Sequence, residues 1–122
     1  QPQIKQTDYS PTLRWISLDI ETHDLRGRLY SIAVSTEDSH QIFMVKHPRQ
    51  VTAEDDGNLN IQWCENEEIA LKKLFHWVDE YDPDVILGWN VIGFDLAFIK
   101  WKCQQIKICL EILSCNLRLL KK

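Results

Sequence analysis

Hydrophobic and polar residues alternate along the first half of the chain in a way that predicts three short strands. Apolar residues dominate from Leu13 to Ile20, and alternation recurs over residues 29–36 and 41–46. A period of two is the pattern of a half-buried strand, and the short polar turns between these stretches favour an antiparallel arrangement. We therefore expect a three-stranded meander, followed by a polar loop over residues 47–60.

In the second half of the chain the apolar pattern changes to the period of helices. Asn66 is a candidate N-cap, and apolar residues then recur at spacings of three and four as far as Val78, which predicts a helix with one buried face. Pro83 stops this helix. The short apolar run 85–89 predicts a buried parallel strand, and residues 94–106 predict a second helix. The predicted order is β-β-β-α-β-α, an α/β domain with a mixed sheet.

The two ends of the chain differ from this central domain. Residues 1–11 are polar and contain two prolines, which indicates a leader or linker before a domain that spans residues 12–105. The apolar tail over residues 106–122 fits a helix, an edge strand or a foreign extension, and the sequence does not separate these three. The chain begins without methionine, so we interpret it as a fragment of a longer protein.

Composition is that of an ordinary globular domain with an acidic balance. The 122 residues are 44% hydrophobic and 26% charged, which is enough to bury a core, and no apolar run is long enough to span a membrane. A formal net charge of −4 disfavours a broad grip on duplex DNA, yet it permits a site that binds only the end of a strand. The four cysteines form no Cys-x-x-Cys pair, as expected of reduced thiols in a cytosolic protein.

Two acidic residues close the first predicted strand, in the stretch "SLDIET". Side chains two apart on a strand point to the same face, so Asp19 and Glu21 project together while Ile20 faces the core. At roughly 6–7 Å and an effective dielectric near 20, two such charges repel by about 2–3 kcal/mol. Hard cations such as Mg²⁺ prefer carboxylate oxygens, which makes the pair a candidate half of a metal site. Alone, an Asp-x-Glu triplet is too common by chance to identify a function.

A second polar feature, "NVIGFD" at residues 90–95, follows the predicted parallel strand. Ligands in open α/β sheets bind at the carboxyl ends of parallel strands, where this feature would place Asn90 and Asp95. The alternative interpretation is an ordinary strand-to-helix loop in which Asp95 interacts with the N-terminus of the next helix. The two features in this order, about 70 residues apart, favour a metal site over either feature alone.

"LDIET" and "NVIGFD", with "YDPDVILGWN" between them, resemble the first and second exonuclease motifs of the 3′–5′ proofreading domain of family B DNA polymerases. The resemblance covers roughly residues 11–102, and its wording is most similar to the bacterial members. It implies a ribonuclease-H-like fold and hydrolysis of the 3′-terminal phosphodiester of single-stranded DNA by two divalent cations, Mg²⁺ or Mn²⁺.

The resemblance also implies roles for individual residues. One cation would lie between Asp19, Glu21 and a later aspartate, and the second would be held by Asp19 and, partly through water, by Asp95. Asn90 and Phe94 would help to seat the terminal nucleotides, and the main chain at Thr22 would contact the 3′ end. Aromatic stacking suits unpaired bases of any sequence, as proofreading requires.

The chain departs from the family pattern after Asp95, because no Tyr-x-x-x-Asp third motif follows. In the family that motif supplies the last metal ligand and a tyrosine that orients the attacking water. We therefore expect the parent enzyme to be a bacterial, cytoplasmic DNA polymerase that acts at the nucleoid, with the rest of its chain as a partner of this domain. The fragment itself should have little or no activity, and the sequence leaves open whether it holds its cations. The alternatives are a stand-alone metal-dependent ribonuclease of the same fold and a catalytically silent interaction module.

Overall fold

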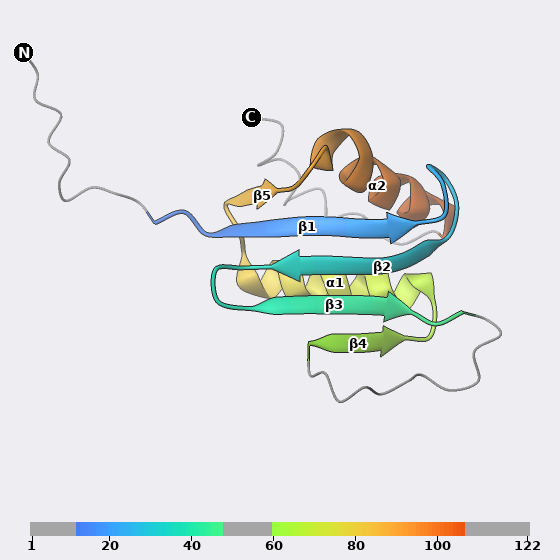
Figure 1. Ribbon diagram of the computed structural model, residues 1–122, viewed down its shortest axis with the longest axis horizontal. Helices are drawn as coiled ribbons and strands as arrows, with labels where there is room; N and C mark the ends of the chain where they lie inside the picture. Colours follow the sequence, from blue (N-terminus) through green and yellow to red (C-terminus); the bar gives the residue numbers. More distant parts are fainter. Residues whose placement is uncertain (1–11, 48–59, 107–122) are drawn as a thin grey trace, which may run out of the picture.

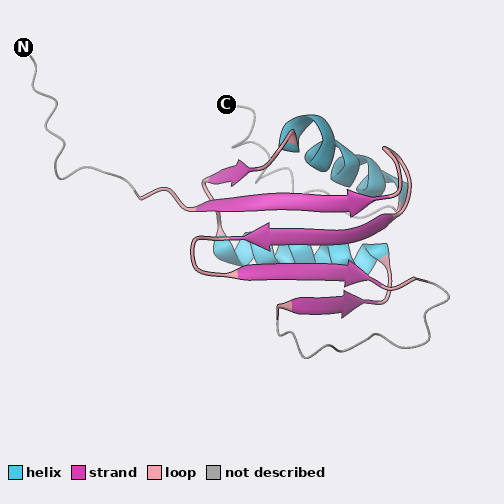
Figure 2. Cartoon of the chain, viewed as in Figure 1, coloured by secondary structure: helices cyan, strands magenta, loops and turns pink. Residues whose placement is uncertain are grey.

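The elements of the chain assemble into a five-stranded sheet with two helices. The computed structural model describes residues 12–47 and 60–106. In chain order they form β1 (Trp15–Thr22), β2 (Leu29–Ser35), β3 (His40–Val45), β4 (Ile61–Cys64), α1 (Glu67–Tyr81), β5 (Val85–Leu87), a π-helical turn η1 (Val91–Asp95) and α2 (Leu96–Gln105). Figure 1 follows these elements along the chain, and Figure 2 separates helices, strands and loops by colour.

The sheet has the strand order β4-β3-β2-β1-β5 and is mixed. β1, β2 and β3 form the predicted antiparallel meander, whereas β4 is parallel to β3 and β5 is parallel to β1. α1 passes behind the strands as it connects the β4 edge to the β5 edge, and α2 lies at the β1 and β5 side of the sheet (Figure 1). The prediction of a mixed α/β sheet with two helices is confirmed.

Alternation in β1 separates the core from the open face of the sheet. Ile16, Leu18 and Ile20 are buried and join one core cluster with side chains of α1 and α2, while Asp19 and Glu21 between and beyond them are exposed. Burial of large apolar side chains is the main force that holds such a layer together. The helical members of the cluster are Ala70, Leu71, Leu74, Phe75 and Val78 from α1, with Leu96, Phe98, Ile99 and Cys103 from α2.

α1 begins and ends where the sequence predicts. The side chain of Asn66, in extended conformation, accepts a hydrogen bond of 2.9 Å from the backbone N–H of Ile69, which makes it a true N-cap. At the other end Asp82 adopts the left-handed conformation, with φ 52°, and its N–H donates to the carbonyl of Val78 at 2.8 Å. Both helix ends therefore have partners for backbone groups that would otherwise be unpaired.

Arg14 ties the start of β1 to the end of α1 and to β5. Its Nε and Nη2 donate to the carbonyl of Tyr81 at 3.0 and 2.7 Å, and its guanidinium carbon lies 4.3 Å from the centre of the Tyr81 ring. The backbone N–H of Asp84 donates to the Arg14 carbonyl at 2.6 Å, and the Asp84 carboxylate accepts from the Arg14 N–H at 2.9 Å. Parallel strands lack a hairpin to set their register, so these long-range bonds align Trp15 with Val85.

The turn between β1 and β2 is closed by hydrogen bonds. The N–H of His23 donates to the carbonyl of Arg28 at 2.8 Å, and the Thr22 hydroxyl donates to the carbonyl of Asp24 at 2.7 Å. A Cβ atom at position 27 would lie 1.8 Å from the His23 carbonyl oxygen, so only glycine fits there. Gly27 therefore allows the tight turn at the end of β1.

Three predictions about the elements need correction. Strand β4 was not predicted, so the order is β-β-β-β-α-β-α, and β4 makes a second parallel pair. The strand expected over residues 85–89 ends at Leu87 and is not buried, since Leu87 is 47% exposed and Trp89 is 94% exposed. It is the edge of the described sheet, with no strand beyond it among the described residues. The second α-helix begins at Leu96 rather than Phe94, because the π-helical turn precedes it.

Several predictions fall on residues outside those described. They concern the leader over residues 1–11, most of the polar loop, and the tail apart from Ile106. The domain limits at 12 and 105 therefore stay predictions. Two of the cysteines, Cys64 and Cys103, lie within the described part of the chain, where both are buried and free. Neither helix in residues 12–47 and 60–106 has the length and apolar character needed to cross a membrane.

Candidate active site

Asp19 and Glu21 lie side by side on the uncovered face of β1, as the alternation predicts. Their cross-strand partners on β2 are Ala33 and Ser31, two small residues that leave the carboxylates open to solvent. Within the described part of the chain, no hydrogen bond or ion pair involves either carboxylate. Two like charges with no cation beside them make this end of β1 a region of negative potential.

Asp95 is the third predicted acid, and it is brought close enough to feel the other two. It ends η1, is only 3% exposed, and its Oδ2 is buried without a hydrogen-bond partner. Burial raises the pKa of Asp95 from 3.8 to about 6, with further contributions from the charges of Asp19 and Glu21. A carboxyl group with this environment is held ready to bind a cation or a proton.

The alternative role for Asp95, an interaction with the N-terminus of α2, involves no capping hydrogen bond. Asp95 occupies the N-cap position of α2, but its backbone is already helical and its side chain makes no capping hydrogen bond. The carboxylate is therefore not used to satisfy the backbone of α2. Oδ2 of Asp95 is therefore left without a hydrogen-bond partner.

The π-helical turn sets the position of Asp95 on the chain. Asn90, the residue before this turn, has φ 52°, and its carbonyl accepts a hydrogen bond of 2.9 Å from the N–H of Phe94. A Cβ atom at position 93 would lie 2.4 Å from Oδ1 of Asn90, so Gly93 permits the Asn90 side chain to fold over the turn. Wide helical turns of this kind occur frequently at functional sites.

Two of the three predicted nucleotide-binding residues line one hollow beside the carboxylates. Thr22 and Phe94 share it with three residues of the β1–β2 turn, namely Asp24, Leu25 and Arg26. Asn90 is exposed but is not among the lining residues. The structure therefore brings the end of β1 and η1 together, as the two motifs predict, whereas Asn90 does not line the hollow.

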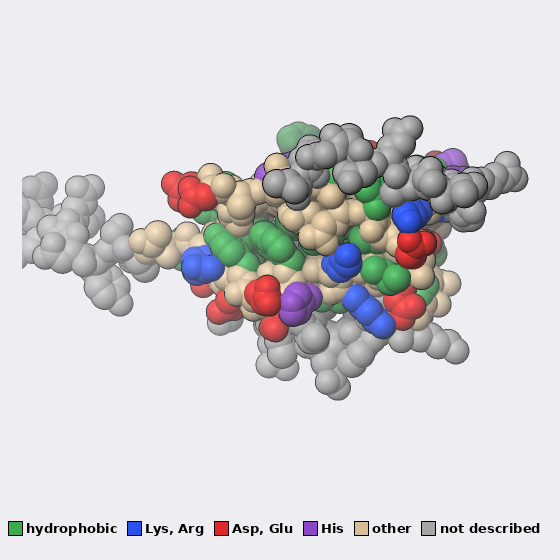
Figure 3. All heavy atoms as spheres, turned by 90° about the horizontal axis from the view of Figure 1, so that it is seen from below, with side chains coloured by type: hydrophobic (Ala, Val, Ile, Leu, Met, Phe, Trp, Pro, Cys, Tyr) green, Lys and Arg blue, Asp and Glu red, His purple; other side chains and the backbone are tan. Residues whose placement is uncertain are grey.

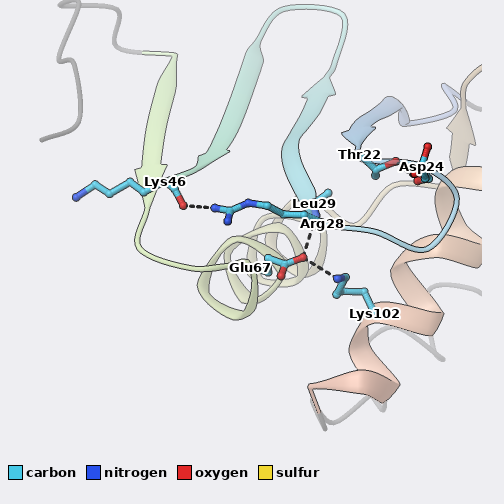
Figure 4. A network of polar contacts seen from close by, with 7 residues as sticks. All are labelled: Thr22, Asp24, Arg28, Leu29, Lys46, Glu67 and Lys102. Atoms are coloured by element: carbon cyan, nitrogen blue, oxygen red, sulfur yellow. Dashed lines mark hydrogen bonds and ion pairs between the residues drawn. The ribbon is translucent and has the colours of Figure 1, made fainter. Parts of the chain in front are cut away.

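A largely buried ion pair between Glu67 and Lys102 lies next to the end of β1. Lys102 Nζ lies 2.9 Å from Glu67 Oε2, and the same oxygen accepts a hydrogen bond of 2.9 Å from the N–H of Leu29 (Figure 4). Lys102 also lies over the rings of Phe98 and Trp101, at 5.6 and 5.0 Å from their centres. Leu29 is the register partner of Thr22, so the pair connects α1 and α2 to the strand end that carries the acids.

The three acidic side chains offer the kind of donor atoms that a hard divalent cation prefers. Three carboxylates supply only oxygen ligands, and the unpartnered Oδ2 of Asp95 is a free buried acceptor. No group of three or more His, Cys, Asp or Glu side chains in the described residues is close enough to hold a metal ion as it stands. The type of donor therefore suits a hard cation, and which residues hold one stays a prediction.

Sequence reasoning missed several residues around the site. Leu25 and Arg26 were taken only as part of a turn, and no signal in the sequence places a turn residue in a hollow. Lys102 left a usable signal, because it falls on the apolar face of its helix, three or four residues from Phe98 and Ile99. A lone charge on a buried helical face predicts a buried partner, here Glu67.

A second hollow lies away from the acids, between α1 and the β3–β4 edge. The face drawn in Figure 3 exposes hydrophobic side chains bordered by charged ones. The hollow is lined by Phe43, Gln62, Ile69, Lys72, Lys73, His76, Trp77 and Glu80. Its polar groups bond to one another or to nearby residues: Lys73 to Gln62, His76 to Glu80, and Lys72 to Glu68. These groups already have partners in the fold.

Comparison with known proteins agrees with the geometry. The sequence matches the family described as DNA polymerase family B, exonuclease domain, over residues 1–120. It is 33% identical to DNA polymerase II of Escherichia coli strain K12 over 105 residues, which is 86% of this chain and 13% of that protein. It is 48% identical over 40 residues, 33% of this chain and 4% of the other, to the DNA polymerase delta catalytic subunit of Caenorhabditis elegans.

A solved structure shares the fold. It is the family B DNA polymerase of the archaeon Pyrobaculum calidifontis, with a TM-score of 0.65 and 23% sequence identity over 88% of this chain and 13% of that one. The chain thus spans about an eighth of the length of the Escherichia coli and Pyrobaculum calidifontis polymerases. The described sheet and helices correspond to an exonuclease-type ribonuclease-H-like arrangement.

Proposed function

Because this chain belongs to the exonuclease domain family of family B DNA polymerases, we propose that it carries part of a 3′–5′ proofreading site for single-stranded DNA. The observation that supports this most is the buried, unpartnered carboxylate of Asp95 beside the exposed pair Asp19 and Glu21. The parent protein is then a cytoplasmic DNA polymerase, and the remainder of its chain is a partner of this domain.

In the proposed site the three carboxylates divide the work of holding two Mg²⁺ or Mn²⁺ ions. Following the family pattern, Asp19 would help to hold both ions, Glu21 would help to hold one of them, and Asp95 would help to hold the other, partly through water. The ions supply activation of water and stabilisation of the departing 3′ oxygen when they are bound. The protein contributes negative charge, an open face over Ala33 and Ser31, and a buried carboxylate poised to lose its proton.

Thr22, Asn90 and Phe94 would position the strand end against the acids. The main chain at Thr22 lies at the end of β1, and Phe94 presents an aromatic surface that suits unpaired bases of any sequence. Asn90 is exposed at the entrance to η1, from where it would reach the nucleotide further from the 3′ end. These three roles follow the family pattern and are proposals for this chain.

The first test is metal binding by the 122-residue chain. Mn²⁺ would be titrated and followed by the paramagnetic broadening of the chain's NMR signals, for the wild type and for Asp19→Asn. We expect Asp19→Asn to weaken Mn²⁺ binding by at least about tenfold, because one shared ligand is lost. Asp79→Asn is the matched control, since Asp79 is exposed on α1. Equal binding by all three proteins would contradict the proposed site.

The second test is nuclease activity. No tyrosine or aspartate follows Asp95 in these residues, so we expect the 122-residue chain to cleave single-stranded DNA weakly or not at all with Mg²⁺ or Mn²⁺. The parent polymerase should cleave it and should lose this activity on Asp19→Ala. Strong cleavage by the short chain that Asp19→Ala abolishes would contradict the expected incompetence. A parallel RNA substrate tests a ribonuclease instead, through dependence on the 2′-hydroxyl.

A further inference from the structure

The tip of the β1–β2 turn presents two residues to the hollow beside the acids without using either of them in the fold. Leu25 is 73% exposed, and Arg26 is exposed as well. Both line the hollow that also contains Phe94. An exposed leucine and an exposed arginine in one hollow provide apolar surface and a positive charge that a ligand could contact.

Arg26 is the positively charged residue among those that line this hollow. Within the described residues it makes no hydrogen bond and no ion pair. The other charge in the lining is Asp24, whose carboxylate lies 3.5 Å from Nε2 of His23. A polyanion that approaches an acidic chain with three carboxylates at its target needs a positive contact, and a guanidinium is well suited to a phosphate.

Leu25 and Phe94 supply apolar surface from two different elements. Phe94 is half-buried in η1 and packs against Phe98, with ring centres 6.2 Å apart, so its ring is held from behind. Leu25 comes from the turn. A base that enters a hollow with an aromatic ring and an aliphatic side chain among its walls would cover the exposed surface of both, which stabilises an unpaired nucleotide.

The backbone of the turn that carries these side chains is held in place before a ligand arrives. The bonds from His23 N–H to Arg28 and from the Thr22 hydroxyl to Asp24 close it on both sides of the tip. Arg28 itself is anchored by a hydrogen bond from its Nη2 to the carbonyl of Lys46 (Figure 4). A closed turn loses less conformational entropy on binding than an open loop, so the two tip residues are preorganised.

We propose that Leu25 and Arg26 form a binding subsite for an unpaired nucleotide next to the 3′ end of single-stranded DNA. Arg26 pairs with a phosphate of the strand, and Leu25 packs with Phe94 against a base. The inference rests on the proposed exonuclease function and adds residues of the turn to its substrate contacts. It assigns them to binding and not to the chemical step.

The test measures DNA affinity. A fluorescent oligothymidylate with phosphorothioate linkages at its 3′ end, which resist cleavage, would be titrated with the 122-residue chain at fixed Mg²⁺ and several KCl concentrations. We expect Arg26→Gln to weaken binding about three- to tenfold and to reduce the salt slope by about 0.7, the value for one phosphate contact on a single strand. Leu25→Ser should weaken binding about two- to fivefold and leave the slope unchanged, because no charge is removed.

The control is Lys72→Gln, which removes the same charge from α1, on the other side of the sheet from the acids. It should change affinity by less than about twofold. The inference is overturned if Arg26→Gln behaves like Lys72→Gln, or if the wild type binds Mn²⁺ through Asp19 but binds no oligonucleotide. If the chain binds neither Mn²⁺ nor oligonucleotide, the proposed function fails as well.

Discussion

The polar side chains at the start of α1 have hydrogen-bond and ion-pair partners, whereas the acidic side chain at the start of α2 does not. At the start of α1, Asn66 accepts from the Ile69 N–H, and Glu67 is paired with Lys102 and with the Leu29 N–H. At the start of α2, Asp95 makes no side-chain cap, and its buried Oδ2 has no partner. The first arrangement holds three elements together, whereas the second leaves a charge in the interior that the fold does not use.

The difference separates groups that serve the fold from groups kept for a ligand. An unsatisfied buried polar group costs about 1–3 kcal/mol, so a sequence selected for stability alone would remove it. Two charged residues are buried in the described part of the chain, Asp95 at the end of η1 and Lys102 in α2. Lys102 has an opposite charge and two aromatic rings around it, and Asp95 has two like charges near it.

The largest effect is expected from breaking the ion pair between Glu67 and Lys102 at the start of α1. Lys102→Met keeps most of the apolar packing on Phe98 and Trp101 but leaves Glu67 without its cation. We expect a loss of about 2–3 kcal/mol in the free energy of unfolding, measured with urea, which is less than for a fully buried pair because Glu67 retains some exposure. Lys100→Met, an exposed lysine on the same helix, should change it by less than about 0.5 kcal/mol. Similar values for the two variants would remove the contrast.

The buried carboxyl group of Asp95, which has no hydrogen-bond partner at Oδ2, should make the stability of the chain depend on pH. The folded-state pKa of Asp95, about 6, lies above its ordinary value of 3.8, so the folded chain holds this proton more tightly than the unfolded chain. The contribution of Asp95 to the free energy of unfolding should therefore fall as pH rises from about 4 to 6, by about 1–2 kcal/mol, and stay level above pH 7.

Asp95→Asn provides the reference for this prediction, because it cannot ionise. Unfolding of both proteins would be measured by urea titration from pH 4 to pH 8, and the difference between them reports Asp95. The variant should gain on the wild type as pH rises. A difference that is constant across this range, or one that changes in the opposite direction, would contradict the assigned environment of Asp95.

A smaller effect is expected at the N-cap of α1. Asn66→Ala removes the acceptor of the Ile69 N–H and should lower the free energy of unfolding by about 1 kcal/mol, measured by thermal or urea unfolding. Asn66→Ser keeps a capping oxygen and should recover most of this loss. If Ala and Ser have the same effect, the Asn66 side chain does not cap the helix.

The smallest effect is the stabilisation that a bound cation gives to the folded chain through the carboxylate of Asp95. Mn²⁺ at a concentration equal to its Kd should raise the stability of the wild type by about 0.4 kcal/mol, since it binds the folded chain. The shift would be measured as a rise in Tm on Mn²⁺ addition. Asp95→Asn should show a smaller rise in Tm than the wild type, and Lys102→Met should show the same rise as the wild type, starting from its own lower Tm. Equal rises in the wild type and Asp95→Asn would place the cation elsewhere.

The order of strands and helices was largely readable from the sequence, because local patterns determine it. Alternation around Ile16, Leu18 and Ile20 identified β1, and Asn66 marked the start of α1. β4 was missed because four residues carry too little periodicity to be recognised after a long polar loop. The exposure of Trp89 was missed for a related reason, since an apolar residue in a short run reads as buried until the neighbouring strands are known.

The candidate acids were also found in the sequence, yet their environments were not. Asp19 and Glu21 follow from a period of two, and Asp95 from its place after a parallel strand. That Asp95 is buried with a free oxygen depends on how η1 packs against β1, which no local pattern contains. The partnership of Lys102 with Glu67 joins residues 35 positions apart, and the hollow of Leu25 and Arg26 joins a turn to a helix 70 residues away.

The sequence by itself determined most of the strands and helices, the core-facing residues of β1 and α1, and the two motifs that belong to an exonuclease family. Only the tertiary structure decided which polar groups are paired and which are left without a partner. The physical reason is that periodicity and capping act over a few residues, whereas burial and charge pairing depend on side chains that the fold brings together from distant positions.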